Sequence, residues 1–253
     1  MIKQIKNGFT AIRDEYNYRK YSPGRVLFDH LPKCAGSAID AYLGSHYPKR
    51  LVFKTDPNQP RSSVAKFKEL STEERHRYRL VVGHMAHDLV DLVHPETTTL
   101  TILREPVDRI VSHYFYVLQQ EQHYLHERVV KDNIQLEDYA TLGLSDELEN
   151  WYTTHFTGLT IEQVEQDPQA ALEHAIDLIA EKYDIIGFQT NLPDVAERLQ
   201  RAACFGDAFE NALTNQTRKR LSLREISDQA RQSIADANAV DVKLYTALQQ
   251  RFG

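Results

Sequence analysis

Cysteine is scarce in this chain, with only Cys34 and Cys204 among its 253 residues. The two lie far apart in the sequence and match neither a disulfide framework nor the ligand spacing of a structural zinc site. This scarcity is typical of a protein that works in a reducing compartment, where both cysteines stay reduced.

Long apolar runs are also missing. No stretch of about 18 consecutive apolar residues occurs, and the first twenty residues lack the apolar core of a secretory signal. We therefore expect no membrane span and a cytoplasmic location. Within residues 1–22, Ile2, Ile5, Phe9 and Ile12 recur at helical spacing, which predicts an N-terminal helical extension.

An excess of basic charge is absent as well, because the formal net charge is −6 and the pI is near 6.0. This balance makes nucleic acid an unexpected partner and confines any basic site to a local patch. The 42% hydrophobic content is ample for a core. Repeats and linker-like segments are lacking too, so we expect a single domain over residues 1–253.

Short apolar segments, each followed by turn residues or a helical pattern, predict five strands at 26–28, 51–53, 80–83, 99–103 and 184–188. Helical patterns alternate with them at 37–45, 63–78, 107–129, 168–182, 192–203 and 223–250, the last breaking near 237–238. This alternation predicts an α/β fold with a mostly parallel central sheet flanked by helices. The polar stretch 119–150 is interpreted as a helical insertion or lid.

The loop after the first predicted strand has the composition of an anion site. Its helix is expected to begin near Ser37, where unpaired amides and the helix dipole favour a phosphate or sulfate. Gly36 permits close backbone approach, Ser37 supplies a cap and a hydroxyl, and Lys33 supplies positive charge. Taken alone, the same residues also fit a plain capped turn with a solvated lysine.

The order of these residues differs from that of an ATP-binding loop. In the pattern G-x-x-x-x-G-K-[ST] the lysine follows the glycine, whereas here Lys33 precedes Gly36 by three positions. No apolar strand ends in an aspartate with an evident magnesium role. A nucleotide-dependent phosphotransferase of the P-loop type is therefore the disfavoured alternative.

The order Pro-Lys-x-x-Gly-Ser resembles the 5′-phosphosulfate loop of sulfotransferases that use 3′-phosphoadenosine 5′-phosphosulfate (PAPS). The form closest to it is His-x-Pro-Lys-Thr-Ala-Gly-Thr-Ser of the carbohydrate sulfotransferases. Two positions depart from that form, since this chain has cysteine and alanine where the family often has threonine and serine. The resemblance implies that the 5′-phosphosulfate is held by Lys33, Cys34, Ala35, Gly36, Ser37 and Ala38.

A second anchor follows the strand at 99–103. Arg104 is placed at a strand's carboxyl end, the edge where open α/β sheets bind ligands, and a guanidinium there can hold a phosphate. On the residues alone, the favoured interpretation is a salt bridge from Arg104 to Glu105 or Asp108, with Ser112 as an ordinary helix serine.

The segment 104–114 also resembles the same sulfotransferases, in their 3′-phosphate motif Arg-[Glu/Asp]-Pro-x-x-Arg-x-x-Ser-x-Tyr. The resemblance implies that Arg104 and Ser112 bind the 3′-phosphate, the group that separates PAPS from ATP. For Arg109 two interpretations stay open, a helper at this phosphate and a solvated helix arginine.

His84 follows the strand at 80–83, on the edge of Lys33 and Arg104 if the strands are parallel. A Gly-His at this point resembles the catalytic base of glycan sulfotransferases such as heparan sulfate 2-O-sulfotransferase. A packed or surface histidine is the alternative. His84 and His87 have a spacing that could hold a metal on a helix, but no further ligands complete a set, so we expect no metal.

The resemblance as a whole implies a P-loop-like, nucleotide-kinase-like sulfotransferase fold and a metal-independent transfer of a sulfuryl group from PAPS to a hydroxyl acceptor. Lys33 then acts at the leaving oxygen and His84 as the base. The acceptor is a glycan, small molecule, lipid-like alcohol or carrier-bound group. A non-catalytic binder of PAPS or of its product, 3′-phosphoadenosine 5′-phosphate (PAP), is a further alternative, and the basic cluster 215–220 either closes over the phosphates or is a solvated turn.

Overall fold

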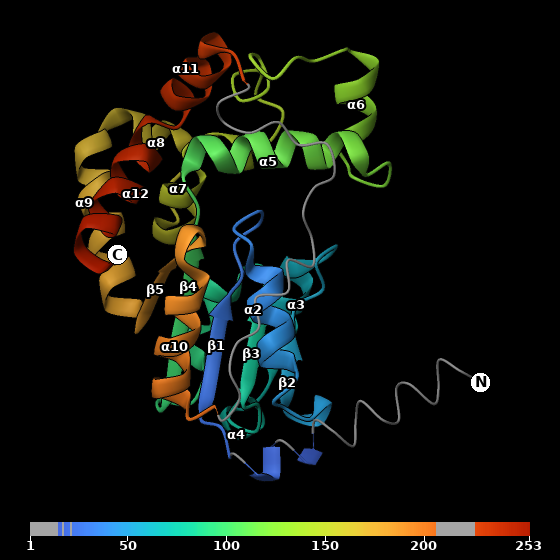
Figure 1. Ribbon diagram of the computed structural model, residues 1–253, viewed down its shortest axis with the longest axis vertical. Helices are drawn as coiled ribbons and strands as arrows, with labels where there is room; N and C mark the ends of the chain where they lie inside the picture. Colours follow the sequence, from blue (N-terminus) through green and yellow to red (C-terminus); the bar gives the residue numbers. More distant parts are fainter. Residues whose placement is uncertain (1–14, 17, 21, 206–225) are drawn as a thin grey trace. The chain divides into compact units, whose positions relative to one another are not determined.

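A computed structural model describes residues 15–16, 18–20, 22–205 and 226–253 of the chain (Figure 1). They form two compact units, Met1–Leu103 with Lys182–Thr214 and Arg104–Glu181 with Asn215–Gly253. The single domain over 1–253 stays a prediction. Most of the predicted N-terminal extension and all of the basic cluster 215–220 lie outside the described residues, although 15–16 and 18–20 are helical.

The first unit contains a five-stranded sheet in which every neighbouring pair is parallel. The strand order is β2-β3-β1-β4-β5. All five predicted strands and the predicted α/β class with a mostly parallel sheet are confirmed. The strands are β1 (Arg25–Asp29), β2 (Val52–Lys54), β3 (Leu80–Gly83), β4 (Thr97–Leu103) and β5 (Ile185–Phe188).

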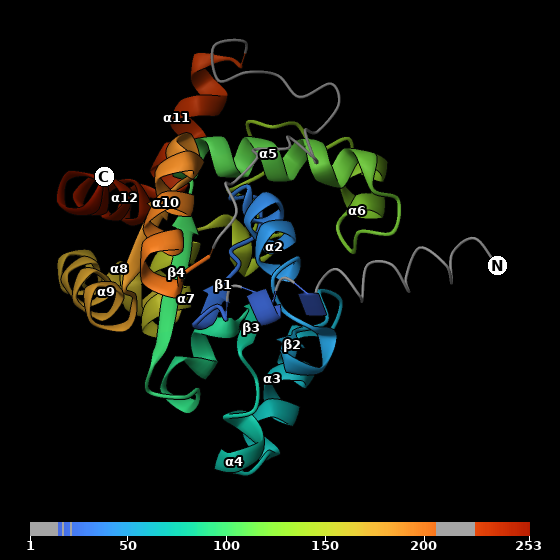
Figure 2. The ribbon, with the colours of Figure 1, turned by 60° about the horizontal axis from the view of Figure 1, so that its bottom comes forward.

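Helices cover both faces of this sheet because alternate strand residues point to opposite sides. Val26 and Phe28 pack in one cluster with α2 (Gly36–Gly44) and α10 (Leu192–Ala203). Both helices lie on the same side of the sheet in Figures 1 and 2. Leu27 faces the other way, towards a cluster that contains residues of α3 (Pro60–Glu69) and of the 3-10 helix η2 (Ala86–Leu92).

The chain leaves the sheet in opposite directions after β1 and after β4. From β1 it runs to β2 at one edge, and from β4 it runs to β5 at the other edge. In an open parallel sheet, ligands bind beyond the carboxyl ends of the strands at such a reversal. The residues that follow β1, β3 and β4 are therefore the ones to inspect for a site.

The predicted helix over 63–78 is two helices, because the backbone at Leu70 is extended. Ser71 then begins α4 (Thr72–Arg75) with a capping box, in which Ser71 and Glu74 each bond the other's backbone N–H. Short 3-10 helices complete the unit as η1 (Lys49–Leu51) and η4 (Gln189–Asn191).

The second unit is helical in its described part, and a cluster of buried apolar residues from several of its helices forms a core. Its elements are α5 (Pro106–Gln119), α6 (His126–Lys131), η3 (Asp146–Leu148), α7 (Trp151–Thr157), α8 (Ile161–Gln166), α9 (Pro168–Lys182), α11 (Asp228–Ala237) and α12 (Ala239–Phe252). The predicted break near 237–238 is present at Asn238. Among the described residues no helix is long and apolar enough to cross a membrane.

The predicted helix over 107–129 ends early, at Gln119. The next residues turn back, and this brings Leu125 and Val129 into the same core cluster as Val117. The residues just after the end of α5, at 120–123, are polar and offer no apolar side chains to continue its buried face. Within 119–150 the end of α5, α6 and η3 are helical, and the other residues form turns, bends and irregular backbone. Whether this segment acts as a lid stays a prediction.

Candidate functional site

The loop between β1 and α2 is irregular in a way that suits an anion. Lys33 and Ala35 have positive φ values of 67° and 61°, whereas Cys34 and Gly36 do not. Backbone of alternating handedness turns successive N–H groups towards one side and makes an anion-binding concavity. The left-handed conformation costs a residue with a side chain about 1–2 kcal/mol, so the surrounding structure must hold this loop in place.

Helix α2 begins one residue earlier than predicted. Its N-cap is Ala35 and its first residue is Gly36, so the prediction that Ser37 caps the helix is wrong. The left-handed backbone at Ala35 turns the chain into the helix without a capping side chain. Ser37 lies in the first turn instead, where its hydroxyl remains a candidate anion donor.

Position 36 has no room for a side chain, because the His30 ring packs against the backbone of Gly36. A Cβ at this position would lie 2.6 Å from His30 Nε2 and 2.9 Å from Phe28 Cζ. The His30 ring in turn stacks on Phe28 with ring centroids 5.3 Å apart. Burial, followed by the neighbouring His84, lowers the pKa of His30 to about 4. His30 is therefore neutral near pH 7, and its ring packs between Phe28 and the backbone of Gly36.

His84 lies beside this loop because β3 pairs in parallel with β1 and their carboxyl ends meet. Its Nδ1 is 2.6 Å from the backbone oxygen of His30. A carbonyl oxygen can only accept, so Nδ1 carries the proton and the neutral ring keeps its lone pair on Nε2. This is the tautomer that a general base at Nε2 requires.

The backbone around His84 is held tightly. Gly83 and Met85, on either side of it, have φ values of 135° and 62°. The hydroxyl of Thr55 donates to the backbone oxygen of His84 at 3.0 Å. Such conformations persist only where several contacts fix them, and they concentrate at functional sites.

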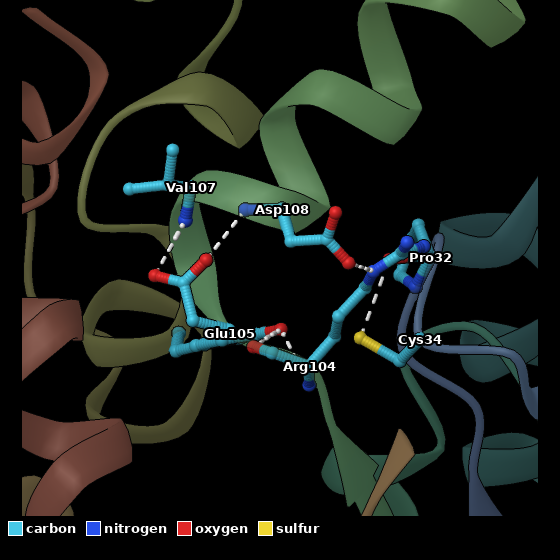
Figure 3. A network of polar contacts seen from close by, with 7 residues as sticks. Pro32, Cys34, Arg104, Glu105, Val107 and Asp108 are labelled. Atoms are coloured by element: carbon cyan, nitrogen blue, oxygen red, sulfur yellow. Dashed lines mark hydrogen bonds and ion pairs between the residues drawn. The ribbon is translucent and has the colours of Figure 1, made fainter. Parts of the chain in front are cut away.

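Arg104 follows directly after the last residue of β4, and its side chain is buried. Its Nε donates to Asp108 Oδ2 at 2.6 Å (Figure 3). Of the two salt bridges that the sequence allowed, the structure shows the one to Asp108. Glu105 instead caps α5, where its carboxylate accepts the N–H groups of Val107 and Asp108 at 3.1 and 2.7 Å. Burial raises the pKa of Glu105.

Ser112 is also buried on α5. It comes four residues after Asp108 and eight after Arg104, so Asp108 and Ser112 share one face of the helix. The helix thus places a carboxylate and a hydroxyl on one side, and Arg104, just before the helix, is hydrogen-bonded to that carboxylate. Such a row can bind a phosphate when the guanidinium changes its partner.

A scan against protein families decides the class of this chain. The model of the Sulfotransferase family matches residues 22–246, which is nearly the whole sequence. The chain belongs to the sulfotransferase family. Its class chemistry is thus sulfuryl transfer to a hydroxyl acceptor. A search of curated proteins returned no match.

In this sulfotransferase the predicted site residues fall in both units. Lys33, His84 and the rest of the 33–38 loop belong to the first unit, and Arg104 and Ser112 to the second. Within the first unit the loop and His84 are brought together through His30. Within the second unit Arg104 and Ser112 lie along α5.

Cys34 and Arg109 are packed more tightly than their positions in the motifs suggested. Cys34 is buried, and its Sγ lies 3.5 Å from the backbone oxygen of Pro32 (Figure 3). The solvated interpretation of Arg109 is wrong, because its side chain is fully buried. It donates to the backbone oxygen of Glu147 at 2.7 Å, and its guanidinium lies 5.0 Å from the centre of the Trp151 ring.

The sequence did not predict that three buried residues of the first unit lie together. Asp29, His87 and Tyr183 form a hydrogen-bonded network next to the turn that carries His84. His87 was named with His84 for a spacing that could hold a metal on a helix. The described residues contain no group of three His, Cys, Asp or Glu side chains that could hold a metal ion, and metal independence stays a prediction.

Proposed function

We propose that this sulfotransferase moves the sulfuryl group of PAPS to a hydroxyl acceptor by in-line displacement. The acceptor oxygen forms a bond to sulfur while the bond from sulfur to the 5′-phosphate oxygen breaks. The products are the sulfate ester of the acceptor, PAP and one proton. Holding the acceptor and the donor in line supplies much of the acceleration in reactions of this kind.

The 33–38 loop is assigned to the 5′-phosphosulfate. The left-handed residues Lys33 and Ala35 give its backbone an alternation that can turn N–H groups towards a bound anion, and Lys33 is assigned to the bridging oxygen. Negative charge grows on that oxygen as the S–O bond breaks, so Lys33 stabilises the transition state more than the bound substrate. Ser37 adds a hydroxyl from the first turn of α2.

His84 is assigned the acceptor's proton. Its Nδ1 proton is engaged by the His30 carbonyl oxygen, so the Nε2 lone pair takes the proton as the acceptor oxygen bonds to sulfur. A general base of this kind contributes about 10²–10⁴-fold. This hydrogen bond is the single observation that carries the proposed mechanism, since it fixes the tautomer as well as the position of the ring.

Arg104 and Ser112 are assigned to the 3′-phosphate. The guanidinium of Arg104 already binds an anionic oxygen, that of Asp108, and a phosphate can take the same donors. This assignment separates PAPS from ATP, which has no 3′-phosphate.

A thermal shift comparison tests the donor. We expect PAP to raise the melting temperature and ATP with magnesium to do little. At about 100 times its Kd, a ligand stabilises the folded state by roughly 2.7 kcal/mol, which is readily measured. Equal stabilisation by PAP and by ATP would favour the phosphotransferase alternative and contradict the 3′-phosphate assignment.

An acceptor panel tests transfer itself. PAP release from PAPS is measured with 4-nitrophenol, with cellobiose, with octyl glucoside and with water alone. We call the member that gives the fastest enzyme-dependent release the reference acceptor. Faster release with an organic acceptor, together with its sulfate ester by mass spectrometry, identifies a catalyst. Tight PAP binding without enzyme-dependent release in any arm would favour the non-catalytic binder.

A further inference from the structure

Asp29 lies at the carboxyl end of β1, directly before the loop that leads to α2, and it is completely buried. Both of its carboxylate oxygens accept hydrogen bonds. The backbone N–H of His87 donates to Oδ1 at 3.2 Å, and the hydroxyl of Tyr183 donates to Oδ2 at 2.9 Å. The carboxylate therefore ties β1 to two segments that are distant in the sequence.

Tyr183 connects Asp29 to His87. Burial first, and then the charge of Asp29, raises the pKa of the Tyr183 phenol well above its usual value. The phenol thus keeps its proton and donates its O–H to Asp29, so towards His87 Nδ1, at 3.0 Å, its oxygen can only accept. The hydrogen bonds therefore have one direction, from His87 Nδ1–H to the phenol oxygen and from the phenol O–H to the carboxylate.

This network holds the start of η2, which carries no capping group of its own. The N-cap residue is Met85, whose side chain makes no capping hydrogen bond, and its backbone is left-handed. Asp29, at the end of β1, supplies an acceptor for the backbone N–H of His87 in the first turn of η2. A carboxylate at a helix N-terminus also interacts favourably with the exposed N–H groups.

The turn fixed in this way contains His84, two residues before η2 begins. The same β1 segment continues into His30, whose backbone oxygen accepts from His84 Nδ1. Asp29 and His30 therefore hold the turn from adjacent positions, one through the His87 amide and one through the His84 ring. Movement of the turn would break the hydrogen bond that sets the tautomer of His84.

We propose that Tyr183 is a positioning residue for the base His84, acting through Asp29 and the 83–87 turn. The inference rests on the proposed function, in which His84 takes the acceptor's proton. Tyr183 does not touch the reacting atoms. Its hydroxyl keeps the carboxylate and the His87 ring in the arrangement that the turn requires.

Tyr183→Phe removes the hydroxyl and keeps the ring. With PAPS and the reference acceptor, we expect the turnover number to fall about tenfold, because small misplacements of a reacting group are costly. The dissociation constant of PAP should stay within about twofold, as expected for a residue that acts on the base rather than on the donor.

Tyr47→Phe is the matched control. Tyr47 is as deeply buried in the same unit, and its hydroxyl donates to the backbone oxygen of Gly24 at 2.8 Å. Tyr183→Phe loses the hydroxyl's hydrogen bonds to Asp29 and His87, and Tyr47→Phe loses the one to Gly24, so both variants should melt at lower temperature. A turnover loss in Tyr183→Phe alone supports the proposal, whereas equal turnover in the two variants overturns it.

The double variant shows whether Tyr183 acts through His84. In the His84→Ala background, Tyr183→Phe should cause no further loss of turnover. The same tenfold loss in that background contradicts the inference while leaving the base assignment intact. If His84→Ala by itself leaves turnover unchanged, the proposed base has failed, so the two failures are distinguishable.

Substitutions of His87 test the network if Tyr183→Phe does not fold. The side-chain amide of asparagine places an N–H near the position of Nδ1, so His87→Asn should keep turnover within about threefold of the parent. His87→Leu has no donor and should lose about fivefold or more, roughly what one buried hydrogen bond is worth. Equal turnover in these two variants overturns the proposal.

Discussion

The 33–38 loop and the start of α5 are both assigned to the phosphate groups of PAPS, yet they are built in opposite ways. In the loop the backbone is irregular, with left-handed residues at Lys33 and Ala35. At α5 the backbone is a regular helix capped by Glu105, and the charge of Arg104 is compensated by Asp108. One site is prepared by its shape and the other by a charge that already has a partner.

This difference separates two ways of binding an anion. A loop that the fold holds in shape points its donors before the ligand arrives and needs no rearrangement, which is the property that favours transition-state stabilisation. A paired arginine must leave one anion for another, so its contribution is the difference between the two interactions. We therefore expect variants of the loop to alter turnover and variants at α5 to alter affinity.

The largest effect is expected for Lys33→Ala. Turnover with the reference acceptor should fall at least about 100-fold, because the contact of Lys33 strengthens as the leaving oxygen gains charge. The affinity for PAP should fall by less. Lys66→Ala, at an exposed position on α3, is the control. A loss of PAP affinity as large as the loss of turnover would make Lys33 an ordinary binding residue.

The next effect tests the other side of the comparison. Arg104→Ala should weaken PAP about 10- to 100-fold, the range of one or two charge-assisted hydrogen bonds. Calorimetric titration measures this, with the exposed Arg128→Ala on α6 as the control. Asp108→Asn should instead tighten PAP a few-fold, because the guanidinium no longer leaves a charged partner. Weaker binding in Asp108→Asn would mean that the carboxylate orients Arg104 for the phosphate.

A smaller effect is expected where Gly36 contacts the His30 ring. Gly36→Ala should destabilise the protein by about 1–3 kcal/mol through overpacking, measured by urea unfolding. Gly44→Ala at the end of the same helix meets nothing within 4 Å and should be neutral or stabilising by up to about 1 kcal/mol. Similar unfolding free energies in the two variants would show that the ring moves aside at little cost.

The smallest effect concerns pH. Because the pKa of His30 is about 4 in the folded protein and 6.5 ordinarily, the unfolded chain binds more protons between these values. The contribution of His30 to stability is complete above pH 6.5 and falls as pH is lowered towards 4. When the pH is lowered from 7 to 5, the free energy of unfolding of the parent should fall relative to that of His30→Gln by on the order of 1 kcal/mol. A parallel pH dependence in the two proteins would contradict the lowered pKa.

The strands and the two anion motifs were predictable because each is a local pattern. An apolar run such as 99–103 indicates a buried strand within a few residues, and the segment from Arg104 to Ser112 covers only the residues directly after β4 and the first two turns of α5. The start of α2 was misplaced because it depends on the left-handed backbone of Ala35, a residue whose side chain does not announce it.

Other features depend on partners that are far away in the sequence. Helix α7 has only seven residues, and the carboxylate of Asp241, nearly ninety residues later, accepts the N–H groups of Tyr152 and Thr153 at its start. Burial raises the pKa of Asp241, while these bonds and the charge of Arg109 oppose that shift. No local signal shows that an aspartate or an arginine will be buried against such partners, so both were missed.

The hydrogen bond between Tyr183 and Asp29 spans 154 positions of the chain, and this separation sets the order in which the protein can mature. The His84 turn is synthesised long before Tyr183, which comes 96 residues after His87. At about 5–20 residues per second, the nascent chain carries Asp29 and His87 for roughly 5–20 seconds before their partner exists. On the role proposed for Tyr183, the His84 ring is aligned only after β5 has joined the sheet. Acquisition of activity during refolding should report docking of the last strand and lag behind formation of the earlier ones.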